Sequence, residues 1–183
     1  MARLPLVDVE SADPELRAVF ERARQAQGQV STLYRTLANS PRMLDAWIGM
    51  AWPLRNDPDT RRSLRELVIM RVAQLTGARY EWAHHWALAV GSGVPEGQLH
   101  ALRSWRQSDA FDESERAVLA YTDEVTEQVA ASDGAFTELA RHFEPGAIVE
   151  LTLTAAFYCC VSRTLRSLAV DLEPGYETVL EAM

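Results

Sequence analysis

The sequence of 183 residues predicts an all-α protein that folds as one compact domain. Along most of the chain, apolar residues recur at spacings of three and four, which is the period of a helix with one buried face. Strict alternation of apolar and polar residues, the signal of a half-buried strand, is almost absent. Proline, glycine and capping residues divide the chain into segments of helical length, and a hydrophobic content of 48% is enough for a sizeable core.

Short polar signals set the helix boundaries in the N-terminal part. Asp13-Pro14 offers an N-cap and a first-turn proline, so a helix is expected to begin there and to continue to about Gln27. Gly28 then breaks it. Two short helices are expected next, over 30–38 and 41–52, because their apolar residues form stripes at helical spacing.

Proline and glycine punctuate the central part of the chain. Pro53 is expected to end or bend the preceding helix, and Asp57-Pro58 is expected to start the next one. Gly77 ends that helix and separates it from its successor. The run from Gly91 to Pro95 stops the successor and restarts a shorter helix that reaches Trp105.

Two more helices are expected in the C-terminal part. One starts at Asp112, where an acidic first turn suits the positive end of the helix dipole. The other runs from Pro145 to about Val170 and is apolar over much of its circumference, as in a helix buried in a core or a subunit interface. Charged residues interrupt it too often for a bilayer span, so protein rather than lipid is expected to cover it. A turn and a short terminal segment are expected after Leu172.

Charge and cysteine content limit the partners. With 18 basic and 26 acidic residues, the net charge of −8 repels phosphate backbones and anionic membranes, which favours a small-molecule substrate over nucleic acid or membrane. The N-terminus has no long apolar run before its acids, and two adjacent cysteines make no disulfide framework, so a cytoplasmic location is expected. Residues 1–57 are expected to form a helical arm on a core of residues 58–183.

Glu81 and His85 form the strongest functional pattern. Residues four apart share a helix face, so a helix starting near Gly77 places the carboxylate one turn from the imidazole. Such a carboxylate orients the ring and raises its basicity, which makes the pair a minimal proton-transfer unit near neutral pH. Glu66 lies on an apolar edge of the preceding helix and is expected to face the pair, although it could also form an ordinary ion pair with Arg62, four residues before it.

Five residues have a spacing that resembles the signature of the carboxymuconolactone decarboxylase and alkylhydroperoxidase D superfamily. They are Glu66, Gly77, Ala78, Glu81 and His85. In the peroxidase branch, the positions matching Ala78 and Glu81 hold a redox Cys-x-x-Cys pair, beside a relay glutamate and histidine at the positions matching Glu66 and His85. This chain lacks both cysteines, and Glu81 at the second cysteine position resembles the decarboxylase branch. The likeness is best over residues 64–100.

The resemblance implies a fold, an assembly and a reaction. The implied fold is an alkylhydroperoxidase D-like helical bundle, and its members assemble as trimers or hexamers. The implied reaction is decarboxylation of a small carboxylated lactone or a related carbonyl acid. In that reaction His85 would donate a proton to carbon, Glu81 would hold the imidazole in one tautomer, and Glu66 would serve as a relay or second acid.

Other polar residues near the pair are weaker candidates. Tyr80 could donate a hydrogen bond to a substrate, and Arg71 or Arg79 could hold a substrate carboxylate. His84 points about 100° away from His85 around the helix and is expected to be solvated or at an interface. No metal and no cofactor is expected, because Glu-x-x-His occurs once where a di-metal bundle needs two copies, and no phosphate-binding glycine loop occurs.

Two other functional classes stay open. A hydroperoxide reductase of the alkylhydroperoxidase D type needs a dithiol to supply electrons. Cys159 and Cys160 are adjacent on a helix and point in different directions, so packing is expected for them rather than redox chemistry. The remaining class is a non-catalytic oligomeric binding protein with the same fold.

Overall fold

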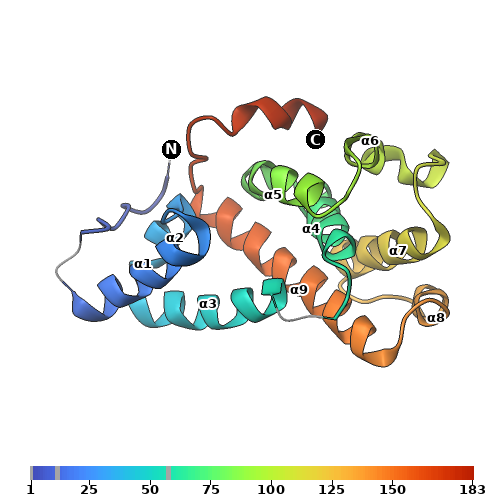
Figure 1. Cartoon of the computed structure of the whole chain (residues 1–183), viewed down its shortest axis with the longest axis horizontal. Helices are drawn as coiled ribbons and strands as arrows, with labels where there is room; N and C mark the ends of the chain where they lie inside the picture. Colours follow the sequence, from blue (N-terminus) through green and yellow to red (C-terminus); the bar gives the residue numbers. More distant parts are fainter. Residues whose placement is uncertain (1, 11–12, 57–58) are drawn as a thin grey trace.

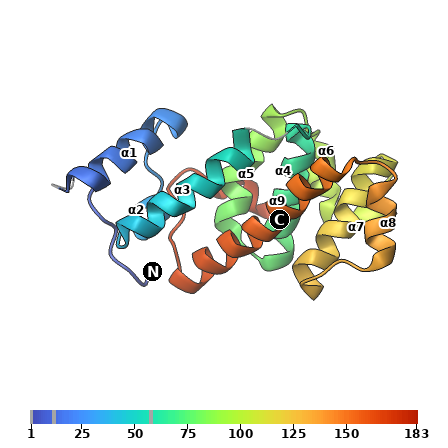
Figure 2. The same cartoon turned by 90° about the horizontal axis from the view of Figure 1, so that it is seen from below.

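The computed structural model describes residues 2–10, 13–56 and 59–183, with the side chains of 26 and 27 left aside. The protein is 73% helical, and its described residues include no strand, which confirms the all-α prediction. Figures 1 and 2 show the helices in two perpendicular views. The elements are α1 (Pro14–Gln27), α2 (Thr32–Leu37), α3 (Pro41–Asn56), α4 (Arg62–Thr76), α5 (Arg79–Gly91), α6 (Glu96–Ala101), the 3-10 helix η1 (Leu102–Gln107), α7 (Glu113–Gln128), α8 (Asp133–Ala140), α9 (Pro145–Leu168) and the 3-10 helix η2 (Glu177–Ala182).

Helix α4 is the centre of the fold. Every residue from Leu64 to Ala73 is buried, and α4 packs against α5, α7 and α9. One hydrophobic cluster joins α4 to the N-terminal helices and to α9, and a second lies between α4, α5 and η1. Because α4 is covered on all sides, its polar residues must find partners inside the protein, and Glu66 is one of them.

Helix α9 lies alongside α3 and crosses the molecule (Figure 2). It is long and apolar enough to span a membrane by length and composition alone. It packs against α3, α4, α7 and α8, as the core helix of a globular domain does. Val149 and Leu153 remain exposed on its outer side, by 56% and 40%. The predicted burial is therefore found on one side of the helix only.

Helix α3 continues through Pro53 to Asn56, so Pro53 does not end the helix, which was one of the two outcomes expected for this residue. A proline removes its own N–H from the helix, but the turn that follows can persist when other groups satisfy its carbonyls. The carbonyl of Arg55 accepts hydrogen bonds from Arg62 Nη1 at 2.6 Å and Arg65 Nη2 at 3.0 Å. These bonds to α4 stabilise the last turn of α3, which carries Arg55.

The starts of the helices show which of the capping residues predicted from the sequence do cap a helix. The carboxylate of Asp13 accepts the N–H of Glu15 at 2.9 Å, and Asp112 forms a reciprocal capping box with Glu115, so both N-caps are confirmed. Helix α4 begins at Arg62. The expected start at residues 57–58, and with it the boundary between arm and core, lies outside the described residues.

Two elements differ from the expected pattern. The expected helix that reaches Trp105 is split into α6 and the 3-10 helix η1. Helix α8 was not predicted, although Ser132 caps it by accepting the N–H of Ala135 at 3.2 Å. Both regions are short, and packing rather than periodicity decides short helices.

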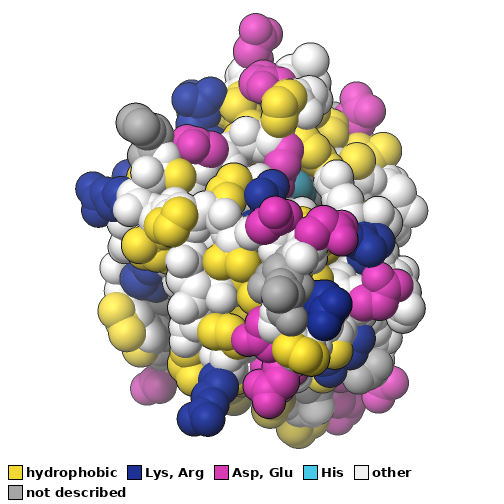
Figure 3. All heavy atoms as spheres, turned by 90° about the vertical axis from the view of Figure 1, so that its left-hand side faces the viewer, with side chains coloured by type: hydrophobic (Ala, Val, Ile, Leu, Met, Phe, Trp, Pro, Cys, Tyr) yellow, Lys and Arg dark blue, Asp and Glu magenta, His cyan; other side chains and the backbone are white. Residues whose placement is uncertain are grey.

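The C-terminal segment crosses above α5 and ends near it (Figure 1). The indole of Trp82 donates a hydrogen bond to the carbonyl of Val179 at 2.9 Å, and η2 packs against α5. This docking places Glu173 and Tyr176 beside the helix that carries His85. On the surface shown in Figure 3, hydrophobic side chains are interspersed with acidic and basic ones.

Candidate functional site

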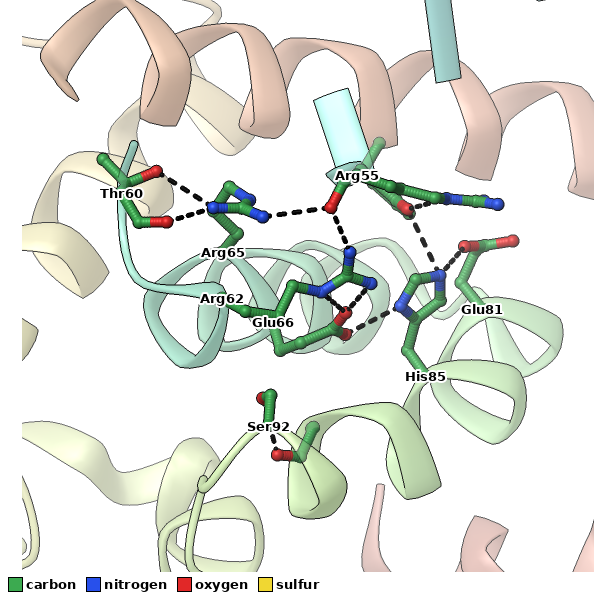
Figure 4. Close-up of polar contacts among 10 residues, drawn as sticks. Arg55, Thr60, Arg62, Arg65, Glu66, Glu81, His85 and Ser92 are labelled. Carbon is green, nitrogen blue, oxygen red and sulfur yellow. Dashed lines mark hydrogen bonds and ion pairs between the residues drawn. The ribbon is translucent and has the colours of Figure 1, made fainter. Parts of the chain in front are cut away.

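Glu66, Glu81 and His85 come together inside the protein (Figure 4). Glu66 projects from α4, while Glu81 and His85 project from α5, and their exposed fractions are 0%, 3% and 2%. Gly77 allows this meeting because it adopts a left-handed conformation, with φ of 65°, and reverses the chain tightly between the two helices. The spacing read from the sequence therefore corresponds to a real cluster of three ionisable groups.

The two nitrogens of His85 have different surroundings. Its Nδ1 lies 2.8 Å from Glu66 Oε2, within a hydrogen bond. Its Nε2 lies 3.3 Å from Glu81 Oε2 and 3.3 Å from the hydroxyl of Tyr158, a residue of α9. Glu66 is thus the group that orients the imidazole, the role that the sequence pattern suggested for Glu81.

One carboxylate oxygen in this cluster is unsatisfied. Glu81 Oε2 is buried and accepts no hydrogen bond from any described residue, although it lies at ion-pair distance from His85. A buried carboxylate oxygen without a donor is costly to keep in a folded protein. Glu81 also lines a cavity, although Oε2 itself is turned toward His85 Nε2, so the carboxylate lies between the imidazole and the cavity.

Glu66 is held from its other side by Arg62. Arg62 Nε donates to Glu66 Oε1 at 2.6 Å, and a second guanidinium nitrogen also contacts that oxygen. The ordinary ion pair that the four-residue spacing allowed does form, but its carboxylate is fully buried and is shared with His85. Glu66 therefore bridges a guanidinium and an imidazole.

The mutual contacts shift both pKa values toward a charged pair. Burial opposes the charge on Glu66, but His85 and Arg62 outweigh it and hold the pKa of this carboxyl below its usual range. Burial likewise opposes the charge on His85, but the contact with Glu66, with help from Glu81, raises the pKa of the imidazole. The structure thus favours an imidazolium that could act as a proton donor.

A cavity of about 990 Å³ lies in front of the cluster. Its walls come from α2, α3, α4, α5 and the C-terminal segment, and both Glu81 and His85 reach it. Three arginines line it as well, namely Arg55, Arg62 and Arg65. In a chain with a net charge of −8, this collection of cations is a local exception that favours an anionic ligand.

Arg55 is the functional candidate that sequence reasoning missed. Its Nε donates to the hydroxyl of Tyr158 at 3.1 Å, whereas its two terminal nitrogens have no hydrogen-bond partner among the described residues. Burial opposes its charge, but Tyr158, Tyr34 and Glu81 outweigh burial and raise the pKa of the guanidinium. Figure 4 shows the guanidinium extending beyond His85, so its free donors are available to a ligand.

The structure places Arg71 and Arg79 outside this cavity. Arg71 Nε lies 2.6 Å from Asp123 Oδ1, and Arg71 Nη1 donates to the carbonyl of Leu102 at 3.1 Å. Arg79 is exposed at the start of α5 and does not line the cavity. The carboxylate-holding role considered for these two residues is therefore corrected, because one is engaged in the core and the other points to solvent.

The Asp123 cluster yields a stability prediction. Asp123 accepts from Arg71, from the indole of Trp105 at 3.2 Å and from Arg106 at 2.7 Å, so Asp123→Ala leaves the guanidinium of Arg71 buried without its anion. Losing one partner of a buried ion pair costs about 3–5 kcal/mol. We expect the free energy of unfolding, measured in urea, to fall by that amount. The matched variant Asp109→Ala, at an exposed position, should change it little; equal effects would contradict the role given to Asp123.

A second polar cluster borders the cavity. Tyr80 donates to Glu173 Oε1 at 2.9 Å, and His84 Nε2 lies 2.7 Å from Glu173 Oε2. The ring of His84 is stacked between Tyr80 and Tyr176, with centroids 4.3 and 4.2 Å apart. Burial opposes the charge of Glu173, but His84 and the backbone N–H of Thr32 outweigh it and lower its pKa to about 2. The hydroxyl of Tyr80 is therefore engaged, and His84 is packed rather than freely solvated.

No dithiol lies beside His85 among the described residues. Ala78 is buried at the position of the first redox cysteine, and Glu81 occupies the second. On α9, Cys159 is buried, as expected for core packing, whereas Cys160 is exposed, which corrects that expectation. The described residues also contain no group of three or more histidine, cysteine or acidic side chains arranged to hold a metal ion.

Solved structures define the class of fold. The debrominase Bmp8, solved with 2,3,4-tribromopyrrole, is 23% identical, with a TM-score of 0.84 over 99% of this chain and 97% of that one. An alkylhydroperoxidase AhpD core protein from Ralstonia eutropha JMP134, described as peroxidase-related, is 16% identical, with a TM-score of 0.80 over 96% and 94%. At these identities the likeness shows the fold, an alkylhydroperoxidase D-like helical bundle as predicted.

Sequence comparison finds a family that part of this chain resembles. Residues 41–124 match the carboxymuconolactone decarboxylase family. The uncharacterized protein YdfG of Bacillus subtilis (strain 168) is 26% identical over 94 residues. The aligned region covers 50% of this chain and 64% of that relative, which is less than two thirds of its length. The family match spans 84 of the 183 residues, just under half of the chain, and together with the fold it makes the chain similar to the carboxymuconolactone decarboxylase and alkylhydroperoxidase D-like proteins.

Proposed function

We propose that this protein is an acid–base enzyme of the decarboxylase type, which acts on a carboxylated lactone or a related carbonyl acid. The observation that carries the proposal is the contact of the Glu81 carboxylate with His85 Nε2, in two residues that line a cavity also lined by Arg55 with its free donors. An acid, a base and an anion-binding cation at one cavity are what proton transfer to a carbon acid requires.

The contacts suggest a division of roles. Decarboxylation releases carbon dioxide and leaves an electron pair on carbon, delocalised onto the neighbouring carbonyl oxygen. The imidazolium of His85 would protonate that carbon, and Glu81 would pass a proton from the cavity back to Nε2. Glu66 would act as a positioning residue that keeps the proton on Nδ1 and raises the pKa of His85. Arg55 would bind a carboxylate that stays on the substrate.

The two other classes fit the site less well. A peroxide reductase would need an electron donor in place of Ala78 and Glu81, and no contact of Cys159 or Cys160 offers one. A scaffold without chemistry would be expected to seal its ionisable groups in the core. Here Glu81 and His85 reach a cavity, which supports the enzyme.

Assembly and location belong to the same proposal. Met43 on α3 and Val149 on α9 are exposed by 60% and 56%, and the two helices lie side by side. Apolar side chains exposed on neighbouring helices support a homo-oligomer, a trimer or hexamer as the resemblance implies. We propose that this assembly works in the cytoplasm on a small-molecule substrate; light scattering in solution that gives a monomer would count against it.

Hydrogen–deuterium exchange tests the proposed chemistry without knowledge of the natural substrate. Carbonyl acids and lactone acids that bind the protein would be incubated with it in D₂O, and deuterium at the carbon next to the carbonyl would be followed by proton NMR. We expect exchange well above the buffer rate, because the groups that protonate a carbanion also remove the proton. A bound acid that exchanges no faster than in buffer, or equally fast with His85→Ala, would contradict the proposal.

A further inference from the structure

The cavity has an aromatic wall that the proposed proton transfer does not use. Five rings from α2, α3, α5 and the C-terminal segment line it, and they are those of Tyr34, Trp52, Tyr80, His84 and Tyr176. The rings are held in place, since Tyr80, His84 and Tyr176 stack on one another and the indole of Trp52 donates to the hydroxyl of Tyr34 at 3.4 Å. Fixed rings offer flat apolar surface at little cost in side-chain entropy.

The cavity is large for the small lactone acid considered from the sequence. Pockets that enclose drug-sized ligands have volumes of about 300–1,000 Å³, and this one, about 990 Å³, lies at the upper end. A lactone acid of about ten non-hydrogen atoms is well below that size. If it were bound at Arg55 and His85, most of the aromatic wall would remain in water. The volume therefore favours a ligand with an extended apolar part.

The polar groups of the cavity limit the charge of that ligand. Arg55 presents two unpaired guanidinium nitrogens, a geometry that matches the two oxygens of one carboxylate. The buried oxygen of Glu81 calls for a donor or a proton rather than a second anion. One acid group near Arg55 and a flat body along the rings satisfy both requirements.

We infer that the substrate is a carboxylic acid with an extended flat ring system, larger than a single lactone ring. The carboxylate binds Arg55, and the ring system packs against Trp52 and the aromatic side chains near it. This inference deepens the proposed function and rests on it for the reaction, but not for the binding. It assigns Arg55 and Trp52 as the residues that determine specificity.

Isothermal titration calorimetry with three probes tests the inference. The probes are 2-naphthoate, its uncharged amide 2-naphthamide, and the ring-poor acid 5-oxotetrahydrofuran-3-carboxylate. We expect 2-naphthoate to bind at least tenfold more tightly than either of the others, because it alone combines the flat body with the carboxylate. Equal affinity for 2-naphthoate and the lactone acid would overturn the aromatic part, and equal affinity for 2-naphthoate and its amide would overturn the role of Arg55.

Variants separate the two contacts. Arg55→Gln should lower the affinity for 2-naphthoate about tenfold and leave the affinity for 2-naphthamide unchanged. Trp52→Leu should lower the affinity for both naphthyl compounds and leave the affinity for the lactone acid unchanged. Arg55→Lys keeps the positive charge but lacks the two parallel donors of the guanidinium, so its affinity for 2-naphthoate should fall between those of the wild type and Arg55→Gln. This variant also provides a test if Arg55→Gln fails to fold. Arg79→Gln, outside the cavity, should bind like wild type; a loss equal to that of Arg55→Gln would overturn the assignment.

Binding and chemistry can fail separately. If 2-naphthoate binds as expected but no bound carbonyl acid exchanges deuterium, the proposed function is wrong and the specificity of the cavity stands. If exchange occurs with small lactone acids while 2-naphthoate does not bind, the reaction stands and this inference is overturned.

Discussion

Glu81→Gln is expected to reduce kcat/KM for carbonyl acids by about 10²–10⁴, the usual contribution of a general acid or base. The substitution keeps the shape of the side chain but removes the carboxylate that lies 3.3 Å from His85 Nε2. After His85 has donated its proton, no carboxylate would then be present to pass a new proton to Nε2. His85→Ala should cost at least as much, because it removes the donor itself.

The same variant should leave the fold intact. Gln has the shape of Glu, and Glu81 Oε2 accepts no hydrogen bond of good geometry, so the substitution removes only the 3.3 Å contact with His85 and leaves the packing unchanged. We expect the free energy of unfolding of Glu81→Gln, measured in urea, to lie close to that of the wild type. Glu96→Gln, at an exposed glutamate of α6, is the matched control for both measurements. A near-normal rate for Glu81→Gln would remove Glu81 from the mechanism.

Glu66→Gln is expected to move the alkaline limb of the pH–rate profile to lower pH. His85 must be protonated to donate, so the rate is lost as the pH rises through its pKa. That pKa is raised because Glu66 is charged and bonded to Nδ1, and a neutral amide in its place lets the pKa fall. Below the limb, the variant should keep much of its rate, since the imidazole itself remains.

The profile of kcat/KM against pH measures this shift in the free enzyme. Glu96→Gln should reproduce the wild-type limb. A merely structural role for Glu66 would lower the rate equally at every pH and leave the limb in place, which is the outcome that would contradict a positioning role.

Local signals account for the parts of the fold that sequence reasoning reached. Asp13, Gly77 and Asp112 act through their own conformation and nearest neighbours, so the helix ends that they mark could be predicted. Pro53 could not be judged in this way. Its helix persists because Arg62 and Arg65 on α4 bond to the carbonyl of Arg55, which is a tertiary contact.

The candidate site likewise contains residues that the sequence could predict and residues that only tertiary packing brings in. Glu81 and His85 meet through helical periodicity, and the superfamily spacing pointed to Glu66. Tyr158 lies in an apolar run of α9 that reads as core, and its contacts with His85 and Arg55 depend on how three helices pack. For the same reason Arg55 carried no signal of its own, because it enters the cavity only when α3 passes Pro53.

The protonation state of His85 tests the central claim most directly. Nitrogen NMR of the protein labelled with ¹⁵N-histidine distinguishes an imidazolium from either neutral tautomer, and His85→Ala identifies the resonance. The contacts with Glu66 and Glu81 predict that both nitrogens of His85 remain protonated above pH 6.5, the ordinary pKa of histidine. A neutral ring already at that pH would contradict the charged pair from which the proposed proton donation follows.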